Sequence, residues 1–482
     1  MHGETEFGIG EESMKKKERK LIEFIGKEMP EKEMYSRIES RIEIKPKRRN
    51  KKKWIVLSSS LTGIAAVGAV VALVLIQPFG RLAKSNSLDE MGYGPTGDSK
   101  TDVAAGSYGY DDIEIDETGN GTGNYSKTLT ATEWNDLSNY SSWLDLLNGK
   151  MYDQNQNLIT EFADLYASVH QQDRFPSTKN KIEVELRDEN GRAYPMASVG
   201  LYDQTGAELY HSISDVKGKS YLYTETETAL EGLKLEVVCG DISYFYSVEE
   251  RSAVYVLPVE SPSVQKIDVA FLIDTTGSMG DELNYIGNEL DGIIREIVGE
   301  ESNCSLNIGL GFYRDREDSY VTRTFDFSSD YEQVIADIKN ESASGGGDYP
   351  EAVDQGLKSI GELSWRADSV KMAFHIFDAP GHSIYYSDIY QHYVDFASAG
   401  IRYIPCAASG LNKVGELIAR EGAILTGGTY VSLTDDSGIG NSHQEITTPS
   451  ETEVEYFNDL IVRLIKQYSG RIEAESSSID ER

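Results

Sequence analysis

Residues 267–280 read Ile-Asp-Val-Ala-Phe-Leu-Ile-Asp-Thr-Thr-Gly-Ser-Met-Gly. The first seven form a mostly apolar run of strand length, which is typical of a strand buried on both faces of a parallel sheet. After the turn, apolar residues recur at helical spacing from Leu283 to Ile294. The stretch therefore predicts a strand that ends at Asp274 and leads through a tight turn into a helix.

Three more apolar runs of strand length follow, at 306–313, 371–377 and 401–407, with helical patterns between them. Such alternation predicts an α/β domain with a doubly wound, Rossmann-like sheet. Ligands of these sheets bind outside the carboxyl ends of the strands, which is where Asp274 and Asp378 both fall.

The residues at this predicted edge suit a hard cation. Asp274 and Asp378 supply carboxylates, while Thr276 and Ser278 can direct neutral hydroxyls at one centre from the same turn. Mg²⁺ prefers six oxygen ligands and keeps several waters. A site with only two carboxylates leaves positive charge on the metal, so an open position can accept a carboxylate from a partner protein.

The motif Asp274-x-Thr276-x-Ser278 resembles the first segment of the metal-ion-dependent adhesion site of von Willebrand factor A (VWA) domains. Phe-Asp-Ala-Pro at 377–380 resembles the third segment and contributes Asp378. The second segment of the family usually supplies a threonine from a Gly-Gly-Thr loop. Here residues 345–351 read Gly-Gly-Gly-Asp-Tyr-Pro-Glu, which is similar to a bacterial subgroup, and Gly347 stands in the threonine position.

The resemblance covers about 200 residues and implies a VWA domain at 262–470 that binds Mg²⁺, or Mn²⁺ or Ca²⁺. It implies that the cation is held, directly or through neighbouring groups, by Asp274, Thr276, Ser278, Asp348 and Asp378. In this reading Asp348 compensates for the missing threonine. The alternative is a metal-free Asp/Ser turn that caps the following helix.

Enzymatic readings have less support in the sequence. A Gly-x-Ser-x-Gly nucleophile turn requires glycine where Thr276 stands. The histidines at 375, 382 and 392 lack His-Glu-x-x-His spacing, although His382 follows Asp378 closely enough to lie behind a metal ligand. Asp315 and Glu351 could form a carboxylate pair, but no substrate-binding pattern accompanies them. We therefore expect no enzyme, and a metal-dependent hydrolase is the weakest alternative.

Two smaller regions precede the predicted VWA domain. Residues 128–176 have apolar residues at helical spacing, with Thr132 as a possible cap and Asn148-Gly149 as a stop. Residues 177–261 alternate apolar and polar residues between turns, which predicts a small all-β sandwich. The stretch from Val184 to Leu209 resembles carboxypeptidase-regulatory-like or collagen-adhesin B-type sandwiches, and we expect a spacer or docking module without chemistry.

The N-terminal part predicts a membrane anchor. Residues 54–77 carry no charge and are long enough to span a bilayer, and seven of the nine residues at 45–53 are basic. Positively charged residues that flank a membrane span stay on its cytoplasmic side. Residues 1–53 are therefore expected to be a cytoplasmic tail, and the C-terminal domains are expected to be extracellular. A cleaved signal peptide is the alternative. Residues 78–127 predict a flexible stalk, and residues 471–482 a disordered tail.

Charge limits the possible partners. The net charge is −34, although residues 1–53 hold 16 Lys and Arg against 11 Asp and Glu. The acidic remainder disfavours nucleic acid. Three cysteines, Cys239, Cys304 and Cys406, are too few for a disulfide framework and predict buried thiols.

The sequence thus predicts a membrane-anchored protein at the surface of a bacterial, Gram-positive-type cell. Its VWA domain is expected to bind a cation and a protein ligand in adhesion. The alternative function is transmembrane signalling, in which residues 14–44 bind a cytoplasmic partner as the tails of membrane-bound anti-sigma factors do. Ligand identity and oligomeric state do not follow from the sequence.

Overall fold

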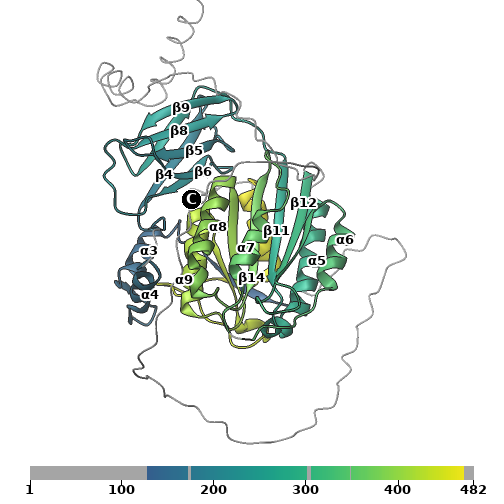
Figure 1. Ribbon diagram of the computed structural model, residues 1–482. Coiled ribbons are helices and arrows are strands. Elements are labelled where there is room, and N and C mark those ends of the chain that lie inside the picture. Colours follow the sequence, from purple (N-terminus) through teal and green to yellow (C-terminus); the bar gives the residue numbers. More distant parts are fainter. Residues whose placement is uncertain (1–127, 172–174, 301–304, 348, 472–482) are drawn as a thin grey trace, which may run out of the picture. The chain divides into compact units, whose positions relative to one another are not determined.

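The structure of the protein is a computed structural model that describes residues 128–171, 175–300, 305–347 and 349–471 (Figure 1). The predicted tail, span and stalk at 1–127, the thiol Cys304, the predicted ligand Asp348 and residues 472–482 lie outside these ranges. Within the described ranges, no helix combines the length and the apolar character needed to cross a membrane. The span at 54–77 and its topology therefore stay predictions.

A mixed sheet forms the centre of the C-terminal domain, with the strand order β13-β12-β11-β14-β15-β16-β1-β17. Five of these strands run parallel: β11 (Lys266–Asp274), β12 (Ser305–Tyr313), β14 (Val370–Phe377), β15 (Ile401–Ala407) and β16 (Tyr430–Leu433). β13 (Thr322–Ser328) pairs antiparallel with β12 at one edge. The predicted doubly wound sheet is thus confirmed, together with its buried strands.

Helices cover both faces of this sheet (Figure 1). One core contains α5 (Leu283–Glu300), α6 (Tyr331–Lys339) and α10 (Phe457–Tyr468), and the other contains α7 (Val353–Gly361), α8 (Tyr386–Ala399) and α9 (Lys413–Thr426). Phe271 and Ile273 of β11 join the first core, and Leu272 between them joins the second. Because both faces are covered, the strand needs apolar residues at consecutive positions.

The far edge of the sheet corrects the prediction of helix around Thr132. Residues Thr130–Trp134 form strand β1, which pairs antiparallel with β16 on one side and with β17 (Val454–Tyr456) on the other. Ala131 is fully buried in this position. Local spacing could not predict β1, because a five-residue strand owes its structure to partners about 300 positions later in the chain.

Two short helices follow β1, as the sequence predicts for this region. α3 (Tyr140–Leu147) ends at Asn148-Gly149, where Gly149 adopts a φ of 62°. A small hairpin, β2 (Met151–Tyr152) and β3 (Leu158–Ile159), separates α3 from α4 (Glu161–Val169). Trp143 and Phe162 are fully buried in the core that they share with α8 and α9. These aromatic side chains therefore serve packing.

The predicted β-sandwich is present as two sheets. One has the order β10-β4-β7, and the other β6-β5-β8-β9. Their strands are β4 (Lys181–Asp188), β5 (Ser198–Tyr202), β6 (Glu208–Ile213), β7 (Lys219–Tyr223), β8 (Lys234–Cys239), β9 (Ile242–Ser247) and β10 (Ser252–Leu257). Asp188, Asp203 and Asp215 close the turns by accepting hydrogen bonds from backbone N–H groups two and four residues later.

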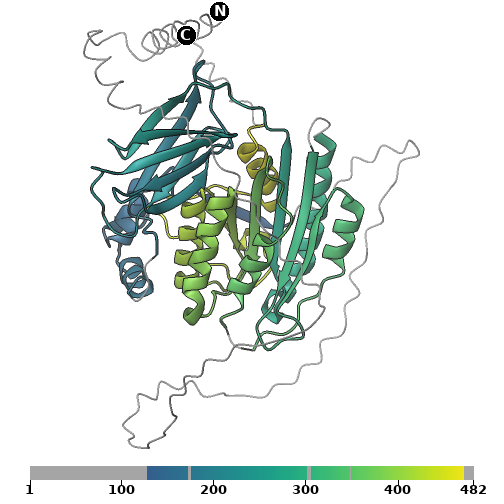
Figure 2. The ribbon, with the colours of Figure 1, turned by 45° about the horizontal axis from the view of Figure 1, so that its top comes forward.

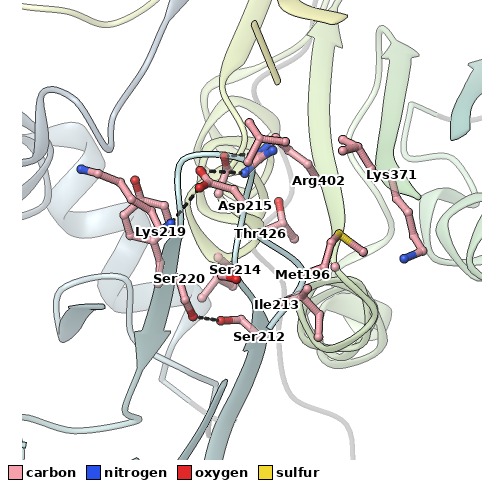
Figure 3. Close-up of a pocket in the computed structure, with 17 residues that line it drawn as sticks. Met196, Ser212, Ile213, Ser214, Asp215, Lys219, Ser220, Lys371, Arg402 and Thr426 are labelled. Atoms are coloured by element: carbon pink, nitrogen blue, oxygen red, sulfur yellow. Dashed lines mark hydrogen bonds and ion pairs between the residues drawn. The ribbon is translucent and has the colours of Figure 1, made fainter. Parts of the chain in front are cut away.

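The sandwich packs directly against the sheet domain, with its teal strands beside the yellow-green helices in Figure 2. The Tyr210 and Tyr223 hydroxyls donate to the Leu425 and Ile424 carbonyls at the end of α9, at 3.0 and 2.8 Å. A cavity of about 40 Å³ remains at this junction, near an Arg402–Asp215 ion pair (Figure 3). The junction lies at the starts of the strands, at the opposite end of the sheet from Asp274 and Asp378.

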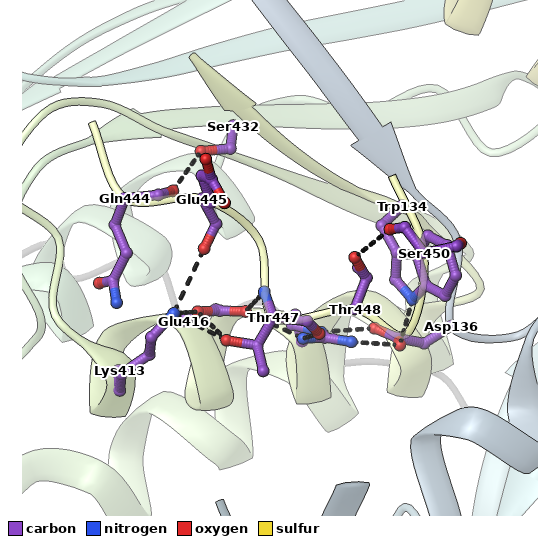
Figure 4. Close-up of polar contacts among 11 residues, drawn as sticks. Trp134, Asp136, Lys413, Glu416, Ser432, Gln444, Glu445, Thr447, Thr448 and Ser450 are labelled. Atoms are coloured by element: carbon purple, nitrogen blue, oxygen red, sulfur yellow. Dashed lines mark hydrogen bonds and ion pairs between the residues drawn. The ribbon is translucent and has the colours of Figure 1, made fainter. Parts of the chain in front are cut away.

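A buried ion network fastens the segment after β1 to α9. The Arg420 side chain is 1% exposed and donates to both oxygens of Asp136, at 2.7 and 2.8 Å. It also donates to Glu416 and to the Thr447 carbonyl, each at 2.9 Å. Figure 4 shows the surrounding contacts, in which Glu416 accepts from the Thr447 backbone and from Lys413. One guanidinium thus connects three segments that are far apart in the sequence.

Candidate metal centre

Asp274 is the last residue of β11 and its side chain is fully buried. Its Oδ1 accepts hydrogen bonds from the Thr276 backbone N–H at 2.9 Å and from the Thr276 hydroxyl at 2.7 Å. Its Oδ2 is buried without a hydrogen-bond partner. A buried carboxylate oxygen that lacks a partner is costly, so Asp274 has one oxygen free to bind a cation.

The turn after Asp274 positions the two predicted hydroxyls. A 3-10 turn, η1 (Gly277–Asp281), starts the path into α5 and carries Ser278. The Thr276 hydroxyl lies 3.2 Å from the Ser278 hydroxyl, so the two oxygens are neighbours. The first segment of the predicted site is thus compact, with hydroxyls placed above a buried carboxylate.

The glycine loop at 345–347 is held against this turn. Gly277 donates its N–H to the Gly345 carbonyl at 3.1 Å, and Gly346 donates to Oδ2 of Asp318 at 2.8 Å. Gly345 has a φ of 84° and approaches Asp318 so closely that an added Cβ would lie 2.3 Å from Oδ1. Glycine is required at Gly345 for both reasons. At Gly347, in contrast, an added Cβ would meet nothing within 4 Å.

Asp378 completes the convergence. It follows β14, and its side chain is 4% exposed at the carboxyl edge next to β11. Thr276, Ser278, Gly347 and Asp378 line one open pocket of about 400 Å³. Asp274 lies beneath this pocket, bonded to Thr276. The structure therefore brings together four of the five predicted site residues, and Asp348 lies outside the described residues.

Other residues also line the pocket: Gly277, Gly345, Gly346, Tyr349, Glu351, Ala379, Ser409, Gly410 and Asn441. Glu351 is the most informative of these, because its side chain is buried and its Oε2 has no hydrogen-bond partner. Glu351 belongs to the glycine loop, but the resemblance to the family points to Asp348, three residues earlier, as the residue that compensates for the missing threonine. Ser409 and Asn441 belong to loops without a recognisable motif.

Negative charge accumulates at this pocket, and Lys and Arg are absent from its described lining. Burial and, to a smaller extent, the nearby Asp378 carboxylate together raise the pKa of Asp274 to about 7, although the Thr276 hydrogen bonds oppose the shift. Burial, followed by Asp274 and Asp315, raises the pKa of Glu351 to about 9. A divalent cation would relieve this repulsion.

The histidines near the pocket are engaged elsewhere. His375 is fully buried, where its ring nitrogens lie 2.9 Å from the Tyr313 hydroxyl and 2.7 Å from the Tyr403 hydroxyl. Burial lowers the pKa of His375 to about 3, so the ring is neutral. His382 contacts Asp315 at 2.8 Å. Among the described residues, no three His, Cys, Asp or Glu side chains are grouped to hold a metal.

Comparison with known proteins identifies the family that part of this fold resembles. Residues 268–388 match the family model of the von Willebrand factor A domain. They include β11 from Asp268 onward, the glycine loop and Asp378, so the predicted VWA domain is present in this part of the chain.

Two curated proteins resemble part of the chain. The alpha-protein kinase vwkA of Dictyostelium discoideum is 28% identical over 137 residues, which cover 28% of this chain and 22% of the kinase. The putative ariadne-like RING finger protein R811 of Acanthamoeba polyphaga mimivirus is 38% identical over 86 residues, which cover 18% of this chain and 8% of that protein. The chain thus spans less than a quarter of the length of either relative.

Two solved structures also show similarity. The conserved hypothetical protein BatB from Bacteroides thetaiotaomicron aligns with a TM-score of 0.30 and 14% identity, over 42% of this chain and 99% of BatB. The pilus adhesin SpaC from Lactobacillus rhamnosus GG aligns with a TM-score of 0.26 and 9% identity, over 41% of this chain and 33% of the adhesin.

Proposed function

We propose that the VWA domain is a cation-dependent protein-binding module that acts in adhesion at a cell surface. The observation that carries the proposal is that Thr276, Ser278 and Asp378 line one open pocket, while Asp274, hydrogen-bonded to Thr276, has a buried carboxylate oxygen without a partner. Oxygen donors of both charged and neutral kinds are the ligands that Mg²⁺ and Mn²⁺ prefer. The tail, the span at 54–77 and extracellular display complete the proposal from the sequence.

The proposed mechanism has two parts. The protein holds the cation through Asp274, Thr276, Ser278 and Asp378, and the pocket leaves one side of the cation open to solvent. A carboxylate of the partner then completes the coordination. Because the surrounding surface is acidic, a partner carboxylate has little reason to approach unless the cation is present. Binding of the partner should therefore depend strictly on the metal.

Calorimetric titration of the EDTA-treated full chain in detergent micelles tests the first part. We expect saturable binding of Mg²⁺ and Mn²⁺. For the second part, Mn²⁺-loaded protein is titrated with acetyl-Asp-amide and with acetyl-Asn-amide while water-proton relaxation is recorded. Only the aspartate compound should displace a metal-bound water. Absence of Mg²⁺ and Mn²⁺ binding, or equal effects of both compounds, would overturn the proposal.

The open space at Gly347 offers a separate prediction. Gly347→Thr is expected to fold normally, with a melting temperature within about 2 °C of the wild type, because an added Cβ meets no neighbour within 4 Å. The added hydroxyl restores the usual family ligand, so Mg²⁺ affinity should rise about tenfold. Gly345→Ala is the matched control, since its Cβ would collide with Asp318 and its φ is positive. Thermal melts and calorimetry of both variants test the prediction. Equal melting temperatures and equal Mg²⁺ affinities of Gly347→Thr and Gly345→Ala would contradict it.

A further inference from the structure

The loop between β16 and β17 forms part of the pocket wall. Its residue Asn441 lines the pocket together with the glycine loop. Further along, the Lys413 ammonium donates to the Glu445 carbonyl and to the Thr447 hydroxyl, at 3.2 and 2.7 Å. The end of the loop is thus attached to α9, and the part that contains Asn441 is attached through a different residue, His443.

The His443 side chain is only 3% exposed and lies between two carboxylates. Its Nε2 is 2.9 Å from Oε1 of Glu282, and its Nδ1 is 2.9 Å from Oδ1 of Asp435. The His443 backbone N–H also donates to Asp435 at 2.8 Å. Asp435 belongs to the same loop, in η3 (Asp435–Ser437). The contact with Glu282 therefore connects the part of the loop that contains His443 to the turn before α5.

Glu282 lies between η1 and α5, four residues after Ser278, and its side chain is fully buried. The same Oε1 accepts the Ser409 backbone N–H at 3.1 Å, and Ser409 lines the pocket. Gly440 approaches so closely that an added Cβ would lie 2.3 Å from this oxygen. One carboxylate thus joins the end of the metal-binding turn to two separate walls of the pocket.

We propose that Glu282 and His443 form a clamp that holds the 440–443 segment, and with it Asn441, against the metal pocket. The clamp regulates the site that the proposed function uses, and it rests on that function for its biological meaning. Both residues are positioning residues, because neither lines the pocket itself. Opening the clamp releases one wall and widens access to the cation.

The clamp is sensitive to pH. The charged groups that face His443 are Glu282, from the turn before α5, and Asp435, from η3. Burial opposes the charged ring, but the two carboxylates outweigh it and raise the pKa of His443 above its usual value. Because the pKa of His443 is higher in the folded than in the unfolded protein, its ion pairs stabilise the clamp fully at pH values below the unfolded pKa near 6.5. This stabilisation is lost as the pH rises through the pKa of the folded protein. The clamp is therefore closed in mild acid and loosens in mild base.

Hydrogen exchange of the full chain in EDTA tests the clamp without any metal. Exchange of backbone amides at 438–444, corrected for the intrinsic pH effect, should be about fivefold faster at pH 8.5 than at pH 6.0. His443→Gln lacks the ionisable ring, so its exchange should be fast at both pH values. His211→Gln is the matched control: His211 contacts Ser198 within the sandwich, and this variant should behave as the wild type.

Equal protection of 438–444 at both pH values in the wild type would overturn the clamp. A second variant guards against misfolding of His443→Gln. Glu282→Gln keeps the shape of the side chain but removes the charge, so it should also abolish the pH effect, and a retained effect would count against the proposal. Mn²⁺ titration of the same proteins, after EDTA has been removed, separates the two proposals. If Mn²⁺ does not bind but the protection of 438–444 depends on pH, the proposed function is rejected and the clamp is kept. If Mn²⁺ binds but the protection does not depend on pH, the clamp is rejected and the proposed function is kept.

Discussion

Asp274→Ala is expected to abolish measurable binding of Mg²⁺ and Mn²⁺ by the full chain, with a loss of affinity of about a hundredfold or more. Asp274 supplies the buried oxygen that lacks a hydrogen-bond partner, and it also orients Thr276 through two hydrogen bonds. Its removal deletes a charged ligand and releases a neutral one. Calorimetric titration of EDTA-treated protein measures the effect, and an affinity close to that of the wild type would contradict it.

The same variant should not unfold the domain. Burial and the Asp378 carboxylate make the charged form of Asp274 unfavourable, as its raised pKa of about 7 indicates. Removing this charge relieves repulsion in the metal-free protein, so its melting temperature in EDTA should equal or exceed that of the wild type. Asp368→Ala is the control, because the Asp368 side chain is 67% exposed and belongs to an ion pair with Lys266 away from the pocket. It should leave metal affinity unchanged.

Arg420→Met is expected to cause the largest loss of stability, about 3–5 kcal/mol. The substitution keeps most of the side-chain volume but leaves the buried Asp136 carboxylate without its cation and removes one of the two cations that contact Glu416. It also removes the hydrogen bond to the Thr447 carbonyl. The midpoint of urea denaturation, followed by circular dichroism, should fall accordingly.

Lys266→Met provides the comparison for this prediction. Lys266 and Asp368 form an ion pair whose side chains are 42% and 67% exposed. Such a pair contributes at most about 1 kcal/mol, because water screens both charges. The urea midpoint of Lys266→Met should lie close to that of the wild type. If the midpoint of Arg420→Met lies equally close, the buried network does not hold the segment after β1 in place.

The parts of the fold that sequence reasoning recovered are those with dense local signals. The run that ends at Asp274 and the strands at 306–313, 371–377 and 401–407 are apolar at consecutive positions, which only two-sided burial explains. β1 has no such signal. Its five residues become a strand because β16 and β17 supply hydrogen bonds on both sides, and that pairing is a property of the folded chain.

The site divides in the same way. Asp274, Thr276 and Ser278 share one turn, and Asp378 follows a recognisable strand, so spacing and strand order suffice to predict them. Glu351 was visible in the glycine loop, but its burial against the pocket was not, since the direction of a side chain depends on its neighbours. Asn441 and the Glu282–His443 contact join segments more than 100 residues apart and carry no motif.

The position of β1 also determines how the domain would bear mechanical load. Because β1 runs antiparallel to β16, the chain enters the sheet at the same edge that holds Asp274, four strands or about 19 Å away along that edge. If the proposed N-terminal anchor and a proposed partner at the pocket were pulled apart, the force would act across the strands. It would separate β1 from the sheet, beginning at the first residue of β1, and would not pass through the sandwich. The Thr128 and Leu129 amides, which donate to Glu289 of α5 at 2.7 and 3.1 Å, would bear that load first.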